Sequence, residues 1–125
     1  MSNDRMTNTD KDFDLSERTG VYGEKVIQFA RTIRLDAINS PLIRQLVRSA
    51  TSIGANYGEA DEAGSKQEFR YRISLCSRES RECRHWLRML VVACPDKKAA
   101  ARELWKEANE LNKIFATIFR RSKPK

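Results

Sequence analysis

The densest run of reactive side chains lies between Glu79 and His85. Glu82 and His85 have the Glu-x-x-His spacing of di-iron bundles, and Cys83 with His85 could form a thiol–imidazole nucleophile. A di-iron site needs two such motifs and two further glutamates, whereas this chain has one histidine. On a helix, Cys83 and His85 point about 160° apart, and His85 faces away from the apolar side. The sequence therefore predicts no metal, no cofactor and no catalytic residue.

Two carboxylates, those of Glu79 and Glu82, are also spaced to share one side of a helix. Paired carboxylates can serve acid–base chemistry, but basic residues surround this pair in the sequence. Charged helix faces are usually paired or solvated. We therefore expect the two glutamates to form ion pairs, either with Arg48 or with a neighbouring subunit.

Arginines occupy another side of the same segment. A stripe contains Arg70, Arg81, Arg84 and Arg88 within about 60° of arc, and Arg78 lies beside them. Arg120 and Arg121 form a second basic element near the C-terminus. Guanidinium groups suit phosphates, and the chain has no RNP aromatics, zinc knuckle or helix-turn-helix spacing for reading bases. Binding through these residues would contact the phosphate backbone and be salt-sensitive. The alternative is a solvated face with local ion pairs.

The overall charge agrees with an anionic partner. The chain has 24 Lys and Arg against 17 Asp and Glu, a formal net charge of +7. This balance favours RNA or DNA as a partner. No apolar run approaches the roughly 18 residues of a membrane span, and the N-terminus lacks the apolar centre of a signal peptide. We expect a cytoplasmic protein without a membrane partner, and the odd number of cysteines indicates buried thiols rather than disulfides.

Four amphipathic helices would position these residues, because apolar side chains recur at steps of three and four in four segments. The expected N-caps are Ser16, Ser40, Ser65 and Asp96. The first helix should end near Leu35, with loops near residues 36–40, 64–65 and 95–96. The predicted fold is all-α, an antiparallel up-down-up-down four-helix bundle over residues 13–121. A flexible tail (1–12) would precede it and a basic tail (122–125) would follow.

The helix expected after Ser40 carries a second stripe of small and polar residues. It consists of Gln45, Ser49, Ser52, Asn56, Glu59 and Ala63. The stripe lies about 115° around the helix from the apolar one. Small side chains let another helix approach closely, and amides can form hydrogen bonds across the contact. We expect this helix to pack in its own bundle and against another subunit, with Trp86 as an aromatic anchor. The alternative is an exposed polar face.

The stretch "QLVRSATSIGANYGEADEAGSKQEF", followed by "LCSRESRECRHWL", resembles a four-helix-bundle family. This family was first noticed as open reading frames in intervening sequences of bacterial 23S ribosomal RNA genes. The resemblance rests on Leu46, Arg48, Ser49, Ala50, Ser52, Ile53, Ala55, Asn56, Tyr57, Glu59, Ala60, Ser65, Glu68, Phe69, Glu79, Glu82, Trp86 and Leu87. Two positions depart from the family pattern: Ser80 stands where the family usually has alanine, and His85 where it usually has tyrosine.

The resemblance implies a ring-like homopentamer of bundles. It also implies kinship with the accessory protein of diversity-generating retroelements, a basic pentamer that binds nucleic acid and its reverse transcriptase. Our leading hypothesis is a non-enzymatic, homo-oligomeric scaffold that binds RNA or DNA through arginine faces. The alternative is an adaptor that docks a partner protein such as a reverse transcriptase, without direct contact to nucleic acid. A metal-dependent enzyme is the third hypothesis, because this fold can host a metal site.

Overall fold

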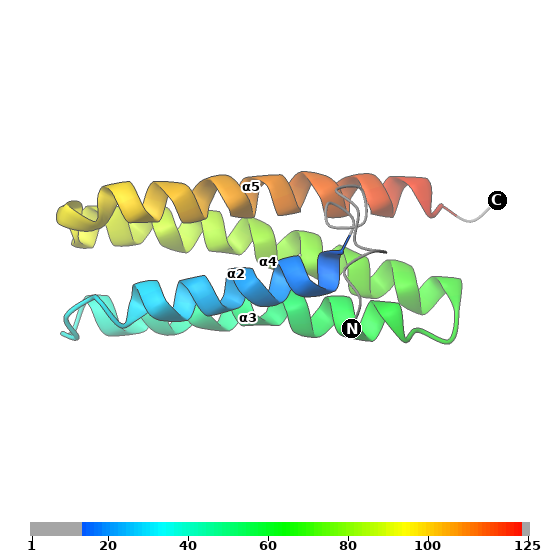
Figure 1. Cartoon of the computed structure of the whole chain (residues 1–125), viewed down its shortest axis with the longest axis horizontal. Coiled ribbons are helices and arrows are strands. Elements are labelled where there is room, and N and C mark those ends of the chain that lie inside the picture. Colours follow the sequence, from blue (N-terminus) through cyan, green and yellow to red (C-terminus); the bar gives the residue numbers. More distant parts are fainter. Residues whose placement is uncertain (1–13, 124–125) are drawn as a thin grey trace, which may run out of the picture.

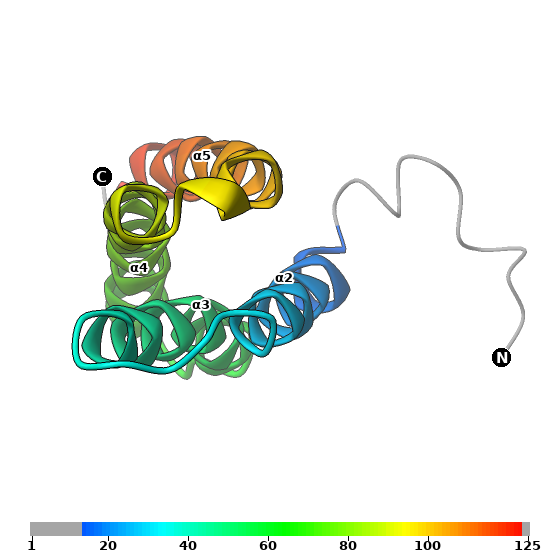
Figure 2. The same ribbon diagram turned by 90° about the vertical axis from the view of Figure 1, so that its left-hand side faces the viewer.

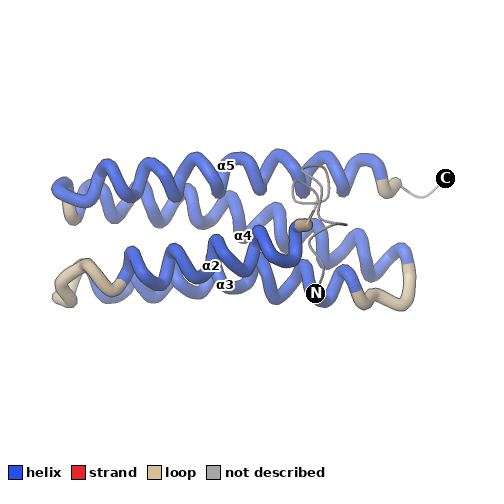
Figure 3. The backbone as a smooth tube through the Cα atoms, viewed as in Figure 1, coloured by secondary structure: helices blue, strands red, loops and turns tan. Residues whose placement is uncertain are grey.

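A computed structural model describes residues 14–123, which form four long helices joined by short connections (Figure 1). The elements are α2 (Leu15–Ala30), α3 (Asn39–Asp61), α4 (Lys66–Ala93), the short 3₁₀ helix η1 (Pro95–Lys97) and α5 (Lys98–Arg121). Successive long helices run in opposite directions, and no strand occurs within 14–123 (Figure 3). The predicted all-α four-helix fold is confirmed. The predicted tail 1–12 lies outside the described residues.

The helices are arranged as an open arc when viewed along their axes (Figure 2). α3 and α4 lie in the middle, α2 lies beside α3, and α5 lies beside α4. α2 has 16 residues against 23 to 28 in the other three, so it covers only part of their length. α2 reaches α5 through polar contacts, including a bidentate pair between Arg18 and Glu107 at 2.7 and 2.9 Å.

The predicted apolar stripes face the core. On α4, the predicted stripe is buried at every position from Ile73 to Cys94, and Phe69 at its start is half-buried. On α5, the stripe from Leu104 to Phe115 is buried, and Ile118 is half-buried. The step of three and four residues predicts these positions because it matches the helical repeat.

One of the predicted helix starts is confirmed. The Ser65 hydroxyl accepts a hydrogen bond from the Glu68 backbone N–H at 3.1 Å, as expected for an N-cap. Ser16 lies inside α2, whose cap is Asp14, because the Asp14 carboxylate accepts from the Glu17 N–H at 3.2 Å. The prediction for Ser16 is therefore wrong by two residues.

The starts of α3 and α5 also differ from the prediction. Asp36 accepts hydrogen bonds from the Ile38 and Asn39 backbone N–H groups at 2.9 and 2.7 Å, so α3 begins at Asn39 and Ser40 is its second residue. Asp36, about one turn before Ser40, is therefore the side-chain acceptor at the start of α3, and not the predicted Ser40. Asp96 lies within η1, and α5 starts without a side-chain cap.

α2 ends at Ala30, earlier than the predicted Leu35. The Thr32 hydroxyl donates to the Phe29 carbonyl at 2.7 Å, and the Ile33 N–H bonds to the Ala30 carbonyl at 3.2 Å. Such bonds satisfy the terminal carbonyls with a tight turn in place of further α-helix. Ile33 is still buried, so the apolar stripe continues into the turn although the helix does not.

A neutral polar cluster at the centre links all four long helices. The Tyr22 hydroxyl of α2 donates to the Leu104 carbonyl of α5 at 2.9 Å. The Cys83 thiol of α4 contacts the Ser49 hydroxyl of α3 at 3.5 Å, and Ser49 donates to the Gln45 carbonyl at 2.9 Å. Burial raises the pKa of Cys83 to about 12 and also raises the pKa of Tyr22. Both groups are therefore uncharged at neutral pH.

We expect Tyr22→Phe to lower the free energy of unfolding by about 1 kcal/mol, because it removes the hydrogen bond to Leu104 but keeps the packed ring. Urea unfolding followed by circular dichroism measures the change. Tyr71→Phe is the matched control, because Tyr71 is exposed. Equal stabilities of the Tyr22→Phe and Tyr71→Phe proteins would contradict the role given to this bond.

Candidate nucleic-acid interface

α4 separates two surfaces of different electrostatic character, one shared with α3 and one shared with α5. We call the outer surface between α3 and α4 the paired face. It contains Gln45, Arg48, Ser52, Asn56, Arg72, Arg78, Glu79, Glu82 and Trp86. We call the outer surface between α4 and α5 the basic seam. It contains Lys66, Arg70, Tyr71, Arg81, Arg84, Arg88, Lys98, Arg102, Trp105, Asn109 and Phe119.

On the paired face, cations and carboxylates neutralise each other. Arg48 forms ion pairs with Glu79 at 3.2 Å and with Glu82. Arg78 approaches the same two carboxylates at 3.7 and 4.0 Å. The predicted ion pair to Arg48 is confirmed within one chain. Glu79 and Glu82 are thus both held by arginines.

The environment of Arg48 favours its charged form. Burial by itself lowers the pKa of Arg48, but the hydrogen bond to Glu82 and the charges of Glu79 and Glu82 outweigh it, so the pKa is raised. The Glu79 side chain is only 7% exposed. A carboxylate buried to this extent is costly unless a cation bonds to it, and Arg48 supplies that bond.

The residues predicted for a subunit contact lie at different depths. Ser49 is fully buried against Cys83, so it has no surface left for a second copy and is removed from the predicted interface. Gln45, Ser52 and Asn56 are half-buried, and Glu59 is exposed. The small size of Ser49 has a cause within the chain, since it lets Cys83 of α4 approach α3 closely.

Trp86 is half-buried on the paired face and has an unsatisfied donor. Its indole N–H is buried and has no hydrogen-bond partner among the described residues. The Nε group of Arg72 also lacks a hydrogen bond, although it lies 4.0 Å from the Glu68 carboxylate, and so does the Nε group of Arg70 in the basic seam. The His85 ring meets Trp86 edge-on at 4.7 Å and is exposed, as its helical position predicts. The paired face therefore combines half-buried apolar surface with two donors that another chain could satisfy.

On the basic seam, arginines bond to neutral groups instead of carboxylates. Arg84 donates to the side-chain carbonyl of Asn109 at 2.6 Å, and its guanidinium lies 5.9 Å from the Trp105 ring centroid. Arg70 lies 3.9 Å over the Phe119 ring and donates to the Phe119 carbonyl at 3.3 Å. These contacts orient the guanidinium groups but leave their charge uncompensated.

Two hollows in the seam have no carboxylate in their lining. One, of about 410 Å³, is bounded by Arg88, Lys98, Arg102 and Trp105 together with apolar residues. The other, of about 650 Å³, lies at the opposite end of α4 and is lined by Lys66, Gln67, Arg70, Tyr71, Ser74 and Phe119. By contrast, all three glutamates of α5 line the hollow on its other side, against α2. The acidic and basic sides of α5 are thus separated.

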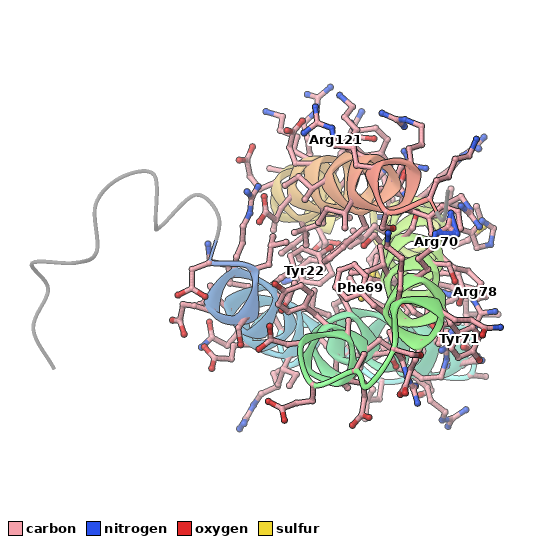
Figure 4. The ribbon with its side chains drawn as sticks, turned by 90° about the vertical axis from the view of Figure 1, so that its right-hand side faces the viewer. Tyr22, Phe69, Arg70, Tyr71, Arg78 and Arg121 are labelled. Atoms are coloured by element: carbon pink, nitrogen blue, oxygen red, sulfur yellow. The ribbon has the colours of Figure 1, made fainter. Side chains whose placement is uncertain are left out.

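The predicted arginine stripe divides between the two surfaces. Arg70, Arg81, Arg84 and Arg88 belong to the seam. Arg78 lies on the outer side of α4 (Figure 4) and is assigned to the paired face because it pairs with Glu79 and Glu82. Arg120 donates to the Thr117 hydroxyl at 3.3 Å, and Arg121 is exposed at the C-terminal end of α5.

The sequence analysis missed the contribution of α5 to the seam. Lys98, Arg102, Trp105 and Asn109 recur at steps of four, three and four, which places them on one side of a helix. This signal was available from the sequence. What the sequence did not show is that this side faces the arginines of α4.

The described residues contain neither a metal-binding cluster nor a membrane-spanning helix. Between residues 14 and 123, no group of three or more His, Cys, Asp and Glu side chains is arranged to hold a metal ion. None of the helices in this range is long and apolar enough to span a membrane.

The sequence matches the family model described as 23S rRNA-intervening sequence protein over residues 11–117. The chain belongs to this family. The chain also has the fold of a crystal structure from Bacteroides thetaiotaomicron VPI-5482, described as a protein of unknown function from the S23 ribosomal protein family. The two share 21% sequence identity with a TM-score of 0.72, over 83% of this chain and 96% of the other. No curated protein sequence matches the chain.

We expect Arg48→Gln to destabilise the protein by about 1–2 kcal/mol, because Glu79 would keep only the more distant Arg78. Arg44→Gln, on the exposed side of α3, should change stability by less than about 0.5 kcal/mol. Thermal and urea unfolding measure both. If Arg48→Gln is as stable as Arg44→Gln, the ion pairs do not stabilise the paired face.

Proposed function

We propose that this protein is a non-enzymatic, homo-oligomeric scaffold that binds RNA or DNA through the basic seam, without sequence specificity. The observation that carries the proposal is the absence of any carboxylate contact to the seam cations within residues 14–123. These cations are Lys66, Arg70, Arg81, Arg84, Arg88, Lys98 and Arg102. A linear array of uncompensated positive charge complements a phosphate backbone.

The arrangement of the seam supports backbone contacts in preference to base readout. α4 and α5 pack against each other along most of their length, so neither is free to enter a DNA groove as a recognition helix does (Figure 1). Contacts to phosphates position a protein on nucleic acid but carry no sequence information. Affinity should therefore depend on salt more than on sequence.

The paired face supports the second part of the proposal, assembly into a homo-oligomer. Half-buried Trp86 and its unsatisfied indole N–H offer an apolar anchor and a donor, and buried aromatic side chains are enriched at protein interfaces. The family resemblance suggests five copies. Assembly would repeat the seam by symmetry, and several weak phosphate contacts would then act together. The proposed location is the cytoplasm, which suits three free, buried cysteines.

One observation favours the alternative function, a protein–protein adaptor. Three large apolar side chains are exposed at one end of the bundle: Leu35 and Ile38 between α2 and α3, and Val92 near the end of α4. Exposed apolar patches mark protein contacts. A partner such as a polymerase could dock there whether or not the seam binds nucleic acid.

We expect Arg81→Gln with Arg88→Gln to weaken binding to every RNA and DNA alike, and to lower the slope of log affinity against log salt by about two. Both residues are exposed, and neither bonds to another described residue, so the fold should be unaffected. Arg84 is left intact because it joins α4 to Asn109. Fluorescence anisotropy with labelled oligonucleotides at several salt concentrations measures both effects.

The matched control is Arg31→Gln with Arg44→Gln, which removes the same charge from exposed positions outside the seam. If the two double variants lose the same amount of affinity for the oligonucleotides, binding depends only on net charge and not on the basic seam. Absence of binding by the wild type at low salt would favour the adaptor.

We expect the wild type to have a mass of several times the 14.4 kDa of one chain, and five times if the family resemblance holds. Ser52→Arg should break the assembly, because it places a long charged side chain at a half-buried position of the paired face whose hydroxyl bonds only within α3. Ala55→Arg, on the exposed side of the same helix, should not. Light scattering measures the masses, and a wild-type mass of one chain would contradict the proposal.

A further inference from the structure

We infer that the ligand of the basic seam is single-stranded nucleic acid, with Tyr71 and Trp105 as platforms on which bases stack. The inference rests on the proposed function and names the form of nucleic acid. It is carried by the exposure and position of these two rings in the seam.

Tyr71 and Trp105 are the exposed aromatic side chains of residues 14–123. Tyr71 is 57% exposed and Trp105 is 40% exposed, whereas the other described Phe, Tyr and Trp side chains are buried or half-buried. Each lies in one of the two carboxylate-free hollows of the seam, Tyr71 beside Arg70 and Trp105 beside Arg88 and Arg102. Figure 4 shows Tyr71 projecting away from the core, while Tyr22 and Phe69 point into it.

An exposed aromatic ring in a cationic hollow can stack on the bases of a single strand but not on those of a duplex. In a duplex the faces of the bases are already stacked on one another, so a protein ring outside the helix meets only backbone. In a single strand a base can turn out and stack on the ring, and neighbouring cations hold its phosphates. Stacking tolerates any base, which agrees with binding that lacks sequence specificity.

The two platforms are also far enough apart to define a site. Arg84, which lies beside Trp105, follows Tyr71 by thirteen residues along α4, a separation of roughly 20 Å. At 3.4 Å for each stacked nucleotide, this distance corresponds to about six nucleotides. Arg81 lies between the platforms and Arg84 lies at the Trp105 end, where both can meet phosphates of the bound strand.

The test compares a twelve-nucleotide single strand with the duplex of the same sequence, by anisotropy at fixed salt. Wild type should bind the single strand more tightly. The double variant Tyr71→Leu with Trp105→Leu should bind the single strand about tenfold or more weakly than wild type, and the duplex less than about threefold more weakly. Tyr71→Phe with Trp105→Phe keeps the rings and should retain most of the single-strand affinity. Circular dichroism and light scattering confirm that each variant is folded and assembled.

Four-nucleotide strands should bind much more weakly than strands of eight or more, because they cannot reach both platforms. The inference is overturned if the leucine variant loses the same fraction of its affinity for the single strand and for the duplex, or if wild type binds the duplex as tightly as the single strand. If Arg81→Gln with Arg88→Gln weakens binding while the leucine variant does not, the proposed function stands and this inference fails. If wild type binds neither ligand, both fail.

Discussion

The buried carboxylate of Glu79 is the constraint on which the charge arrangement of the molecule depends. α4 must pack against α3 to complete the core, and that packing buries Glu79 almost fully. Such a group needs a cation, and Arg48 reaches it from α3 while Arg78 approaches from the preceding position of α4. These two arginines are thereby neutralised, and Arg72 bonds to Asn56 of α3. The other four arginines of α4 lie toward α5, which presents amide, carbonyl and aromatic groups to Arg70 and Arg84, so the positive charge collects along one seam.

The core helps to keep these surfaces separate because its polar groups carry no charge. Tyr22, Ser49 and Cys83 satisfy one another or backbone carbonyls, and burial raises the pKa of both the phenol and the thiol. The acidic side of α5 faces α2, where Glu107 bonds to Arg18. Carboxylates thus lie on both flanks of the bundle but not in the basic seam. One side of α4 is therefore available for the proposed subunit contact and the other for the proposed ligand.

Local sequence rules predicted the four helices, most core positions and the cap at Ser65, because each depends on residues within one or two turns. They failed where a residue's role depends on the helix opposite. Ser49 has the small size of a contact residue, yet its contact is Cys83 of the same chain. Arg78 is a different case, because it meets Glu79 and Glu82 of its own helix, and the i, i+4 spacing to Glu82 is a local signal that was available from the sequence. Trp105 joins the seam from a helix about twenty residues further along the chain, which no local pattern links to Arg84.

The central claim is that nucleic acid meets the α5 side of α4 and not the α3 side, and the two tryptophans of the chain report on these sides separately. Fluorescence of two single-tryptophan proteins, titrated with a short oligonucleotide at low salt, tests this directly. In Trp86→Phe the remaining Trp105 lies in the basic seam, and its emission should be quenched as the ligand binds. In Trp105→Phe the remaining Trp86 lies on the paired face, and its emission should stay constant. Quenching of Trp86 with no change at Trp105 would contradict the account.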